Sequence, residues 1–147
     1  MLKISVKTFQ ELSITELYEI LQLRSAVFVV EQDCVYQDLD GKDQKALHVI
    51  GFKENRVVAY TRIFKAGAYF KETSIGRVVV AGDVRKYGYG VDIMKASIVA
   101  IKENYNETAI RISAQTYLLK FYTSLGFVRV GEEYLEDGIP HVNMMKT

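Results

Sequence analysis

Gly88 and Gly90 follow a polar turn that contains Arg85 and Lys86, and a helical apolar pattern begins after them. Before the turn runs a β-branched segment from Ile75. Glycines let the backbone approach a ligand closely, and the first N–H groups of a helix lack intrahelical partners. A strand that opens through glycines into a positively polarised helix start is suited to bind anions. The spacing therefore predicts a site for a phosphorylated ligand.

Two common phosphate loops do not fit this stretch. A Walker loop needs Lys after its last glycine, where Val91 stands, and the dinucleotide motif needs a third glycine where Ile93 stands. The remaining pattern, Arg85-x-x-Gly88-x-Gly90 after a hydrophobic strand, resembles the acyl-CoA pyrophosphate loop of the GNAT acyltransferases.

Composition narrows the class of protein. With 147 residues, 49% hydrophobic and 25% charged, the chain predicts one globular domain over residues 1–147. A net charge of +1 with scattered Lys and Arg indicates no nucleic-acid partner. A single cysteine, Cys34, excludes an internal disulfide. The N-terminal stretch has no apolar core, so we expect no signal peptide or membrane span and a cytoplasmic location.

Residues 32–46 form the most polar segment of the chain. Asp38, Asp40 and Asp43 suggest calcium, but the twelve-residue template would place Tyr36 and Leu47 at its end positions. We therefore expect no metal here, but a solvated loop with a short helical turn. Its carboxylates make it a candidate wall for a cationic substrate.

The first two elements are predicted from alternation and capping. Residues 2–9 alternate as an edge strand does, and Ser13 with Glu16 forms a capping box that predicts a helix from Ile14. The expected apolar stripe of that helix is Ile14, Leu17, Tyr18, Leu21 and Phe28. Arg24 and Glu31 fall on the same face, which fits either a buried ion pair or a substrate cleft.

The rest of the chain alternates between strand and helix patterns. Strands are predicted over residues 47–52, 57–64, 75–80, 109–114, 127–130 and 133–135, with helices after Gly90 and over 117–125 and a turn at 137–138. The helix after Gly90 should end at Asn104 or Asn106. Because a strand, a helix and a strand follow one another, the strands at 75 and 109 should be parallel.

Several separated motifs, in order, extend the resemblance over nearly the whole chain. Residues 114–127 resemble the final helix of GNAT proteins, with an aromatic-Tyr pair and a Gly-Phe end. The ElaA-like branch of that superfamily is similar at FVVEQDC (28–34), DLDGKD (38–43), His48, IGRVVV (75–80) and EDGIPH (136–141).

The resemblance implies an α/β fold of the α+β type. It has a mixed, mostly antiparallel sheet of about seven strands and helices on both faces, with a central parallel pair that splays to admit CoA. The residues it assigns to acetyl-CoA are Val78, Val79, Val80, Arg85, Lys86, Tyr87, Gly88, Tyr89, Gly90, Val91 and Tyr122. Tyr87 and Tyr89 are bulkier than is usual in such a loop.

The resemblance also implies an N-acetyltransferase in which an amine attacks the thioester directly. Tyr122 matches the general acid of the family. A tyrosine hydroxyl, with an ordinary pKa of about 10, is protonated at neutral pH and can protonate the leaving sulfur. The helix pattern alone equally fits a core tyrosine. We name Glu31 or His48 as the base, with Glu136 and His141 as further candidates.

Arg24, Glu31 and His141 are the predicted acceptor-binding residues. The acidic segments, including Glu136 and Asp137, favour a cationic amine. Two rival functions remain: a non-catalytic acyl-CoA-binding regulator, and a protein-interaction module that binds no CoA. The sequence predicts no metal and no membrane partner, and it leaves a homodimer open.

Overall fold

The computed structural model describes residues 2–147. Seven strands form one sheet: β1 (Lys3–Thr8), β2 (Leu47–Lys53), β3 (Arg56–Phe64), β4 (Thr73–Val80), β5 (Ile110–Gln115), β6 (Val128–Glu136) and β7 (Ile139–Lys146). Their order across the sheet is β1-β2-β3-β4-β5-β7-β6, and only the β4–β5 pair is parallel. The predicted parallel pair is confirmed.

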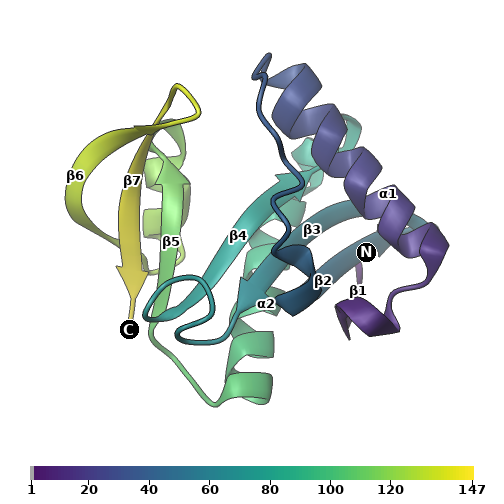
Figure 1. Cartoon of the computed structure of the whole chain (residues 1–147), viewed down its shortest axis with the longest axis horizontal. Helices are drawn as coiled ribbons and strands as arrows, with labels where there is room; N and C mark the ends of the chain where they lie inside the picture. Colours follow the sequence, from purple (N-terminus) through teal and green to yellow (C-terminus); the bar gives the residue numbers. More distant parts are fainter. Residues whose placement is uncertain (1) are drawn as a thin grey trace.

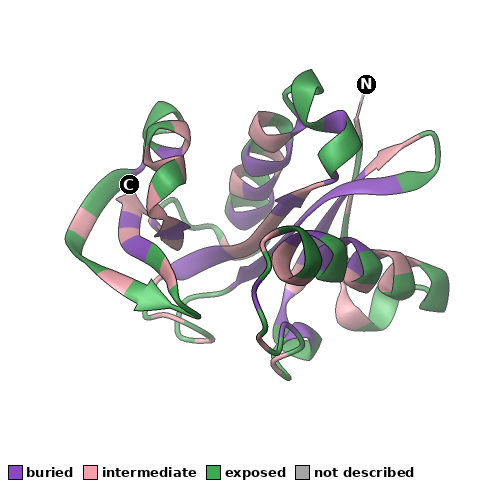
Figure 2. Ribbon diagram, turned by 90° about the horizontal axis from the view of Figure 1, so that it is seen from above, coloured by how far each residue is buried: buried purple, intermediate pink, exposed green. Residues whose placement is uncertain are grey.

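Helices cover both faces of the sheet. They are α1 (Ile14–Arg24), α2 (Tyr89–Tyr105) and α3 (Leu119–Ser124), with a π-helical segment η2 (Ser25–Glu31) that continues α1 and short 3-10 turns η1 (Phe9–Glu11), η3 (Asp43–Lys45), η4 (Gly82–Tyr87) and η5 (Thr116–Leu118). Figure 2 shows α1 and α2 on opposite sides of the buried central strands. Two apolar clusters result, one under each helix layer. The mixed sheet with helices on both faces matches the predicted fold class.

The start of α1 follows the predicted capping box, but its predicted apolar stripe is only partly correct: Leu17, Leu21 and Phe28 are half-buried, and the other two residues are exposed. Ser13 accepts the backbone N–H of Glu16, whose carboxylate accepts the backbone N–H of Ser13. Ile14 is nevertheless 90% exposed and Tyr18 63% exposed. The buried face is Ile20, Leu23, Arg24 and Val27. Both sets of residues have helical spacing, so periodicity does not show which set is buried. Packing of the helix against the sheet buries the second set.

Strands β4 and β5 separate soon after they meet. Between the two strands as the structure describes them, only Thr73 pairs with Ile110 and Ser74 with Arg111. Figure 1 shows β5 turning away from β4 beyond this point. The backbone groups of β4 that face β5 after Ser74 therefore have no ladder partners on β5 and are available to a ligand.

A bulge bends β4 in the same region. Tyr60 pairs with Val79 and Arg62 with Gly76, so two steps along β3 oppose three along β4. Arg77 takes a left-handed φ of +51° there. Bulges leave a residue out of the ladder and re-aim side chains, and they are common beside active sites. The bulge therefore adds unpaired backbone to the strand that faces the gap.

The C-terminal hairpin differs from its prediction in one respect. The two short strands predicted at 127–130 and 133–135 are a single strand, β6, with an irregularity between Val130 and Tyr134. Gly131 has a φ of +80° in this stretch, so the apparent break in the pattern is a bulge. The predicted turn is confirmed, since Asp137 and Gly138 both have positive φ. No helix within residues 2–147 is long and apolar enough to cross a membrane.

Candidate active site

A cavity of about 540 Å³ lies where β4 and β5 separate. The backbone of β4 from Ser74 to Val80 forms one wall, and Ile112, Ser113 and Gln115 of β5 form the opposite wall. The start of α2 and the aromatic residues of α3 line one end of the cavity, and the β6–β7 turn lines another part. Residues from both halves of the sheet thus share one space.

The glycine turn leads directly into this cavity. Gly88 precedes α2 with a φ of +75°, and Gly88, Gly90 and Val91 all line the cavity. No side chain caps the helix start at Gly88, so the first-turn N–H groups of α2 are open to a ligand. A Cβ on Gly90 would lie 3.4 Å from Phe121 Cζ. The missing side chain therefore keeps the cavity open beside the start of α2.

Most of the predicted acetyl-CoA residues line the cavity, and three do not. Val78, Val79, Val80, Arg85, Gly88, Gly90, Val91 and Tyr122 line it. The side chain of Tyr89 is buried in the α1-side apolar cluster, and Lys53 Nζ lies 4.2 Å from the centre of the Tyr87 ring. Lys86 is exposed outside the cavity. The side chains of these three residues therefore do not line the cavity.

Arg85 is engaged by Glu31 across the mouth of the cavity. Its Nη1 and Nη2 donate to the two carboxylate oxygens of Glu31 at 2.5 and 2.9 Å, and its Nε donates to the Val80 carbonyl. Because both oxygens of Glu31 are occupied by a guanidinium, the structure argues against Glu31 as the base. Glu31 lines the cavity beside Arg85.

Tyr122 of α3 lines the cavity and belongs to the apolar cluster on the α2 side of the sheet. The residue is 5% exposed, and its ring lies edge-on to Phe121 and Phe127, with centroids 5.1 and 6.1 Å away. Burial, and to a smaller extent Tyr117, raises the pKa of Tyr122 above its ordinary range. The hydroxyl is therefore protonated at neutral pH and can donate.

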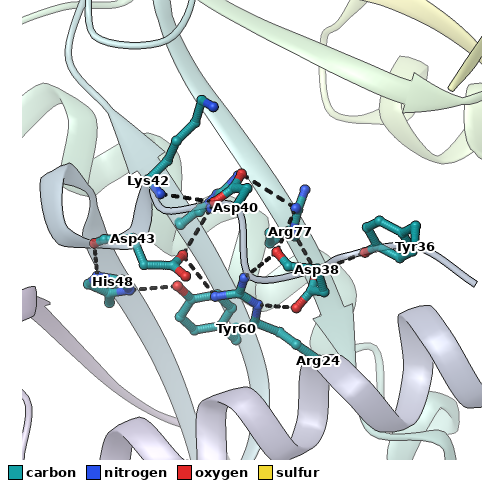
Figure 3. Close-up of polar contacts among 10 residues, drawn as sticks. Arg24, Tyr36, Asp38, Asp40, Lys42, Asp43, His48, Tyr60 and Arg77 are labelled. Carbon is teal, nitrogen blue, oxygen red and sulfur yellow. Dashed lines mark hydrogen bonds and ion pairs between the residues drawn. The ribbon is translucent and has the colours of Figure 1, made fainter. Parts of the chain in front are cut away.

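Arg24 does not line the cavity, so its predicted role in acceptor binding is wrong. It is 0% exposed, and it donates through Nε to Asp38 and through Nη1 to Asp43 at 2.9 Å each. Figure 3 shows it beneath the loop that carries these carboxylates. The sequence left two interpretations of Arg24 open, a buried ion pair or a residue of a substrate cleft. The structure shows the buried ion pair.

The carboxylates of the loop that contains Asp38, Asp40 and Asp43 are also paired with arginines from the sheet. Arg62 donates to Asp40 and Asp43, and Arg77 pairs with Asp38 at 2.7 Å. Despite burial, hydrogen bonds and charges of Arg62 hold the pKa of Asp40 well below its usual range. The prediction that these carboxylates face a cationic substrate is wrong, since arginines of the same chain already bind them.

His48 is also a structural residue and not a base at the cavity. It is buried, does not line the cavity, and has both ring nitrogens engaged. Nε2 donates to the Asp43 carbonyl at 2.9 Å, which leaves Nδ1 to accept from the Tyr60 hydroxyl at 2.6 Å. Burial lowers the pKa of His48. A neutral imidazole fully used in this way cannot serve a substrate.

The β6–β7 turn brings a different set of polar residues to the cavity. Glu136, Asp137 and His141 line it, and so do Ser113 and Gln115 of β5. The sequence analysis did not identify Ser113 or Gln115 as site residues, because a local strand pattern does not show which strand borders a cavity. Within residues 2–147, no cluster of three or more His, Cys, Asp or Glu has the arrangement of a metal site.

Comparison with known proteins identifies the family of this fold. The family model described as "Acetyltransferase (GNAT) domain" matches residues 9–147. The chain belongs to the GNAT acetyltransferase family. Within this family it is similar to Protein ElaA of Escherichia coli K12, with 42% identity over 92% of this chain and 90% of ElaA.

Solved GNAT-family structures agree with the fold. An acyl-CoA N-acyltransferase from Pseudomonas aeruginosa is 37% identical with a TM-score of 0.94, and E. coli ElaA is 39% identical with a TM-score of 0.92. Both alignments cover 100% of each chain. The predicted resemblance to the ElaA-like branch is thereby confirmed.

Proposed function

We propose that this chain is an N-acetyltransferase that moves an acetyl group from acetyl-CoA to a primary amine by direct attack on the thioester. The observation that carries the proposal is the two-residue β4–β5 register. It leaves one edge of β4 free along a cavity that also meets the start of α2 and Tyr122. An extended, phosphate-bearing thioester matches that combination of features.

The chain offers a distinct group for each part of such a ligand. Backbone groups of Val78 and Val80 would bind the amide-containing arm once Arg85 releases the Val80 carbonyl, and the N–H groups at Gly88–Val91 would hold the pyrophosphate. The unpaired backbone at the β4 bulge could donate an N–H to the negative charge that develops on the carbonyl oxygen. Arg85 would exchange Glu31 for phosphate oxygens, which are also acceptors for a guanidinium.

Tyr122 would act as the general acid toward the leaving sulfur. Its pKa, raised by burial, is well above that of a thiol, for which cysteine gives about 8.5. Complete proton transfer to the sulfur would therefore be unfavourable, and a hydrogen bond that strengthens as charge develops is the main contribution expected.

The proposal is tested by thermal unfolding and by thiol release. Acetyl-CoA at a hundred times its Kd should stabilise the fold by about 2.7 kcal/mol, which is several degrees in Tm. Thiol release should then depend on an added primary amine such as cadaverine, spermidine or a lysine peptide. A Tm rise without thiol release from any amine would instead indicate the acyl-CoA-binding regulator. No Tm rise near millimolar ligand would contradict acetyl-CoA binding altogether.

A further inference from the structure

His141 lies where the three C-terminal strands meet the cavity. In register, it pairs with Gln115 of β5 on one side and Tyr134 of β6 on the other. It is 6% exposed, yet it lines the cavity together with Glu136 and Asp137. Its imidazole is thus shielded from bulk water but borders the space that a substrate would enter.

The hydrogen bonds of His141 determine which ring nitrogen carries its proton. Nδ1 lies 2.7 Å from the carbonyl oxygen of Ile139, which can only accept, so Nδ1 must donate. In the neutral ring, Nε2 is then left with a lone pair. Nε2 lies 3.4 Å from Oε2 of Glu136. The ring is therefore set to take up a proton on the nitrogen beside that carboxylate.

Packing holds the ring in this orientation. The Tyr134 ring stacks on it with an interplanar angle of 26°, and the Tyr134 hydroxyl is hydrogen-bonded to Ser113 of β5. Cys34 Sγ donates to the Asp137 carbonyl at 3.4 Å, which ties the β6–β7 turn to the loop after η2. The imidazole is thus held by three neighbouring segments.

The charged side chains around His141 that lack an opposite-charge partner in the described residues are acidic. Arg111, near Tyr134, is bound by Glu72, and the other arginines that line the cavity are each bound by a carboxylate. Glu136 on β6 and Asp137 in the turn are carboxylates, while Tyr134, Gln115 and Cys34 are uncharged at neutral pH. Gln115 is itself paired with Gln32, the residue that follows η2, at 3.4 Å. Unlike Asp38, Asp40 and Asp43, neither Glu136 nor Asp137 has an arginine or lysine partner within residues 2–147. This part of the cavity therefore favours a cation.

We propose that this end of the cavity is the acceptor site, where Glu136 binds a primary ammonium and His141 Nε2 removes its proton. The inference rests on the proposed acetyl transfer. The amine nitrogen forms a bond to the acetyl carbon while the carbon–sulfur bond breaks. The first ammonium proton passes to His141 Nε2 before the attack. The second proton leaves the same nitrogen as the amide forms and is taken up by the departing sulfur, whose developing charge is stabilised by a hydrogen bond from Tyr122.

Acetyl transfer to an amine requires a group that removes a proton from the bound ammonium. A primary alkylamine with a pKa near that of lysine, about 10.4, is almost entirely protonated at neutral pH and cannot attack as an ammonium. An imidazole is the side chain whose ordinary titration lies closest to neutral pH. The His141–Glu136 pair therefore supplies both a counter-ion for the bound cation and an acceptor for its proton.

The test compares His141→Gln with His48→Gln in thiol release with cadaverine and spermidine between pH 6 and 9. His141→Gln should lower kcat/KM by about 10²- to 10⁴-fold near pH 7, with the loss shrinking as the free amine deprotonates. Its acetyl-CoA-induced Tm rise should equal that of the wild type. His48→Gln should keep the wild-type pH profile, because its ring lies outside the cavity.

The Glu136→Gln variant tests the role of the carboxylate separately from that of the His141 imidazole. Loss of the carboxylate should raise KM for the cationic amine and leave kcat closer to the wild-type value, because the substitution removes the counter-ion but keeps the imidazole. A His141→Gln enzyme with wild-type kcat/KM and the same ascending limb of the pH profile would overturn this inference and leave the proposed function standing. Failure of the wild type to release thiol with any amine would overturn both.

Discussion

Tyr122 combines a buried ring with a hydroxyl at the cavity, so its two contributions can be separated by removing one oxygen atom. Tyr122→Phe keeps the edge-on contacts with Phe121 and Phe127. We expect stability and acetyl-CoA affinity to change little and kcat to fall. General-acid catalysis raises reaction rates by about 10²- to 10⁴-fold. Because the raised pKa of Tyr122 makes it a weaker proton donor, the loss of kcat should lie toward the lower value.

Steady-state kinetics with cadaverine, under conditions where chemistry limits turnover, measure this effect. Tyr105→Phe is the matched control, because it removes the hydroxyl of a half-buried tyrosine at the end of α2 that does not line the cavity. Equal turnover by Tyr122→Phe and the wild type would remove Tyr122 from the mechanism.

At the level of elements, the start of α2 depends on the absence of a side chain at Gly90. In Gly90→Val, the added atoms would press on Phe121 and Val80, both of which line the cavity. The fold should persist, because Gly90 does not have a left-handed φ. We expect the acetyl-CoA-induced rise in Tm to disappear.

Thermal unfolding with and without acetyl-CoA measures this change. Lys95→Val places a valine on the exposed side of α2 instead, and it should retain the full acetyl-CoA-induced rise in Tm. Normal binding by Gly90→Val would show that the pyrophosphate does not approach this turn.

The loop that contains η3 is held to the sheet by buried charge. Asp43 Oδ1 accepts from both Arg24 Nη1 and Arg62 Nη1 at 2.9 Å. In Asp43→Ala, two buried guanidinium groups each lose a partner, and breaking a buried ion pair in this way typically costs about 3–5 kcal/mol. We expect the free energy of unfolding in urea to fall by that amount.

An exposed ion pair provides the control for this loss. Asp83 pairs with Arg56 at 2.8 Å on the surface, where solvent screens the charges, so Asp83→Ala should change stability little. Similar effects of the two substitutions would mean that the buried network does not hold the loop.

For the whole molecule, His48 links stability to pH. Burial lowers the pKa of His48 in the folded protein, so the unfolded chain binds a proton at a higher pH than the folded chain does. The resulting stability is fully present above the unfolded pKa of about 6.5 and is lost as the pH falls through the folded pKa. The wild-type Tm should therefore decrease as the pH is lowered from 7 to 5.

His48→Gln tests this linkage through the slope of Tm against pH. The substitution disturbs two buried hydrogen bonds, so Tm should be lower at pH 8, but it should vary less between pH 7 and 5. An unchanged slope would assign the pH dependence to other groups, such as the carboxylates that Arg24 and Arg62 bind.

Much of the fold was predictable because its signals are local. Alternation, the Ser13 capping box and the turn at Asp137 depend on residues within one turn or strand of each other. The order strand, helix, strand then determined the parallel β4–β5 pair. The glycine turn was predictable for the same reason, since Gly88 and Gly90 act through the backbone of their own segment.

The roles of the polar residues depended on contacts between distant segments. Arg24 lies 14 residues from Asp38 and 19 from Asp43, and no periodicity relates positions so far apart. Burial made His48 structural, whereas the β6–β7 turn carried His141 to the cavity. The sequence by itself determined most of the elements and the glycine turn before α2. Only the tertiary structure decided which carboxylates and histidines were bound by their own chain and which remained free for a substrate, because charge pairing and burial depend on distances in space.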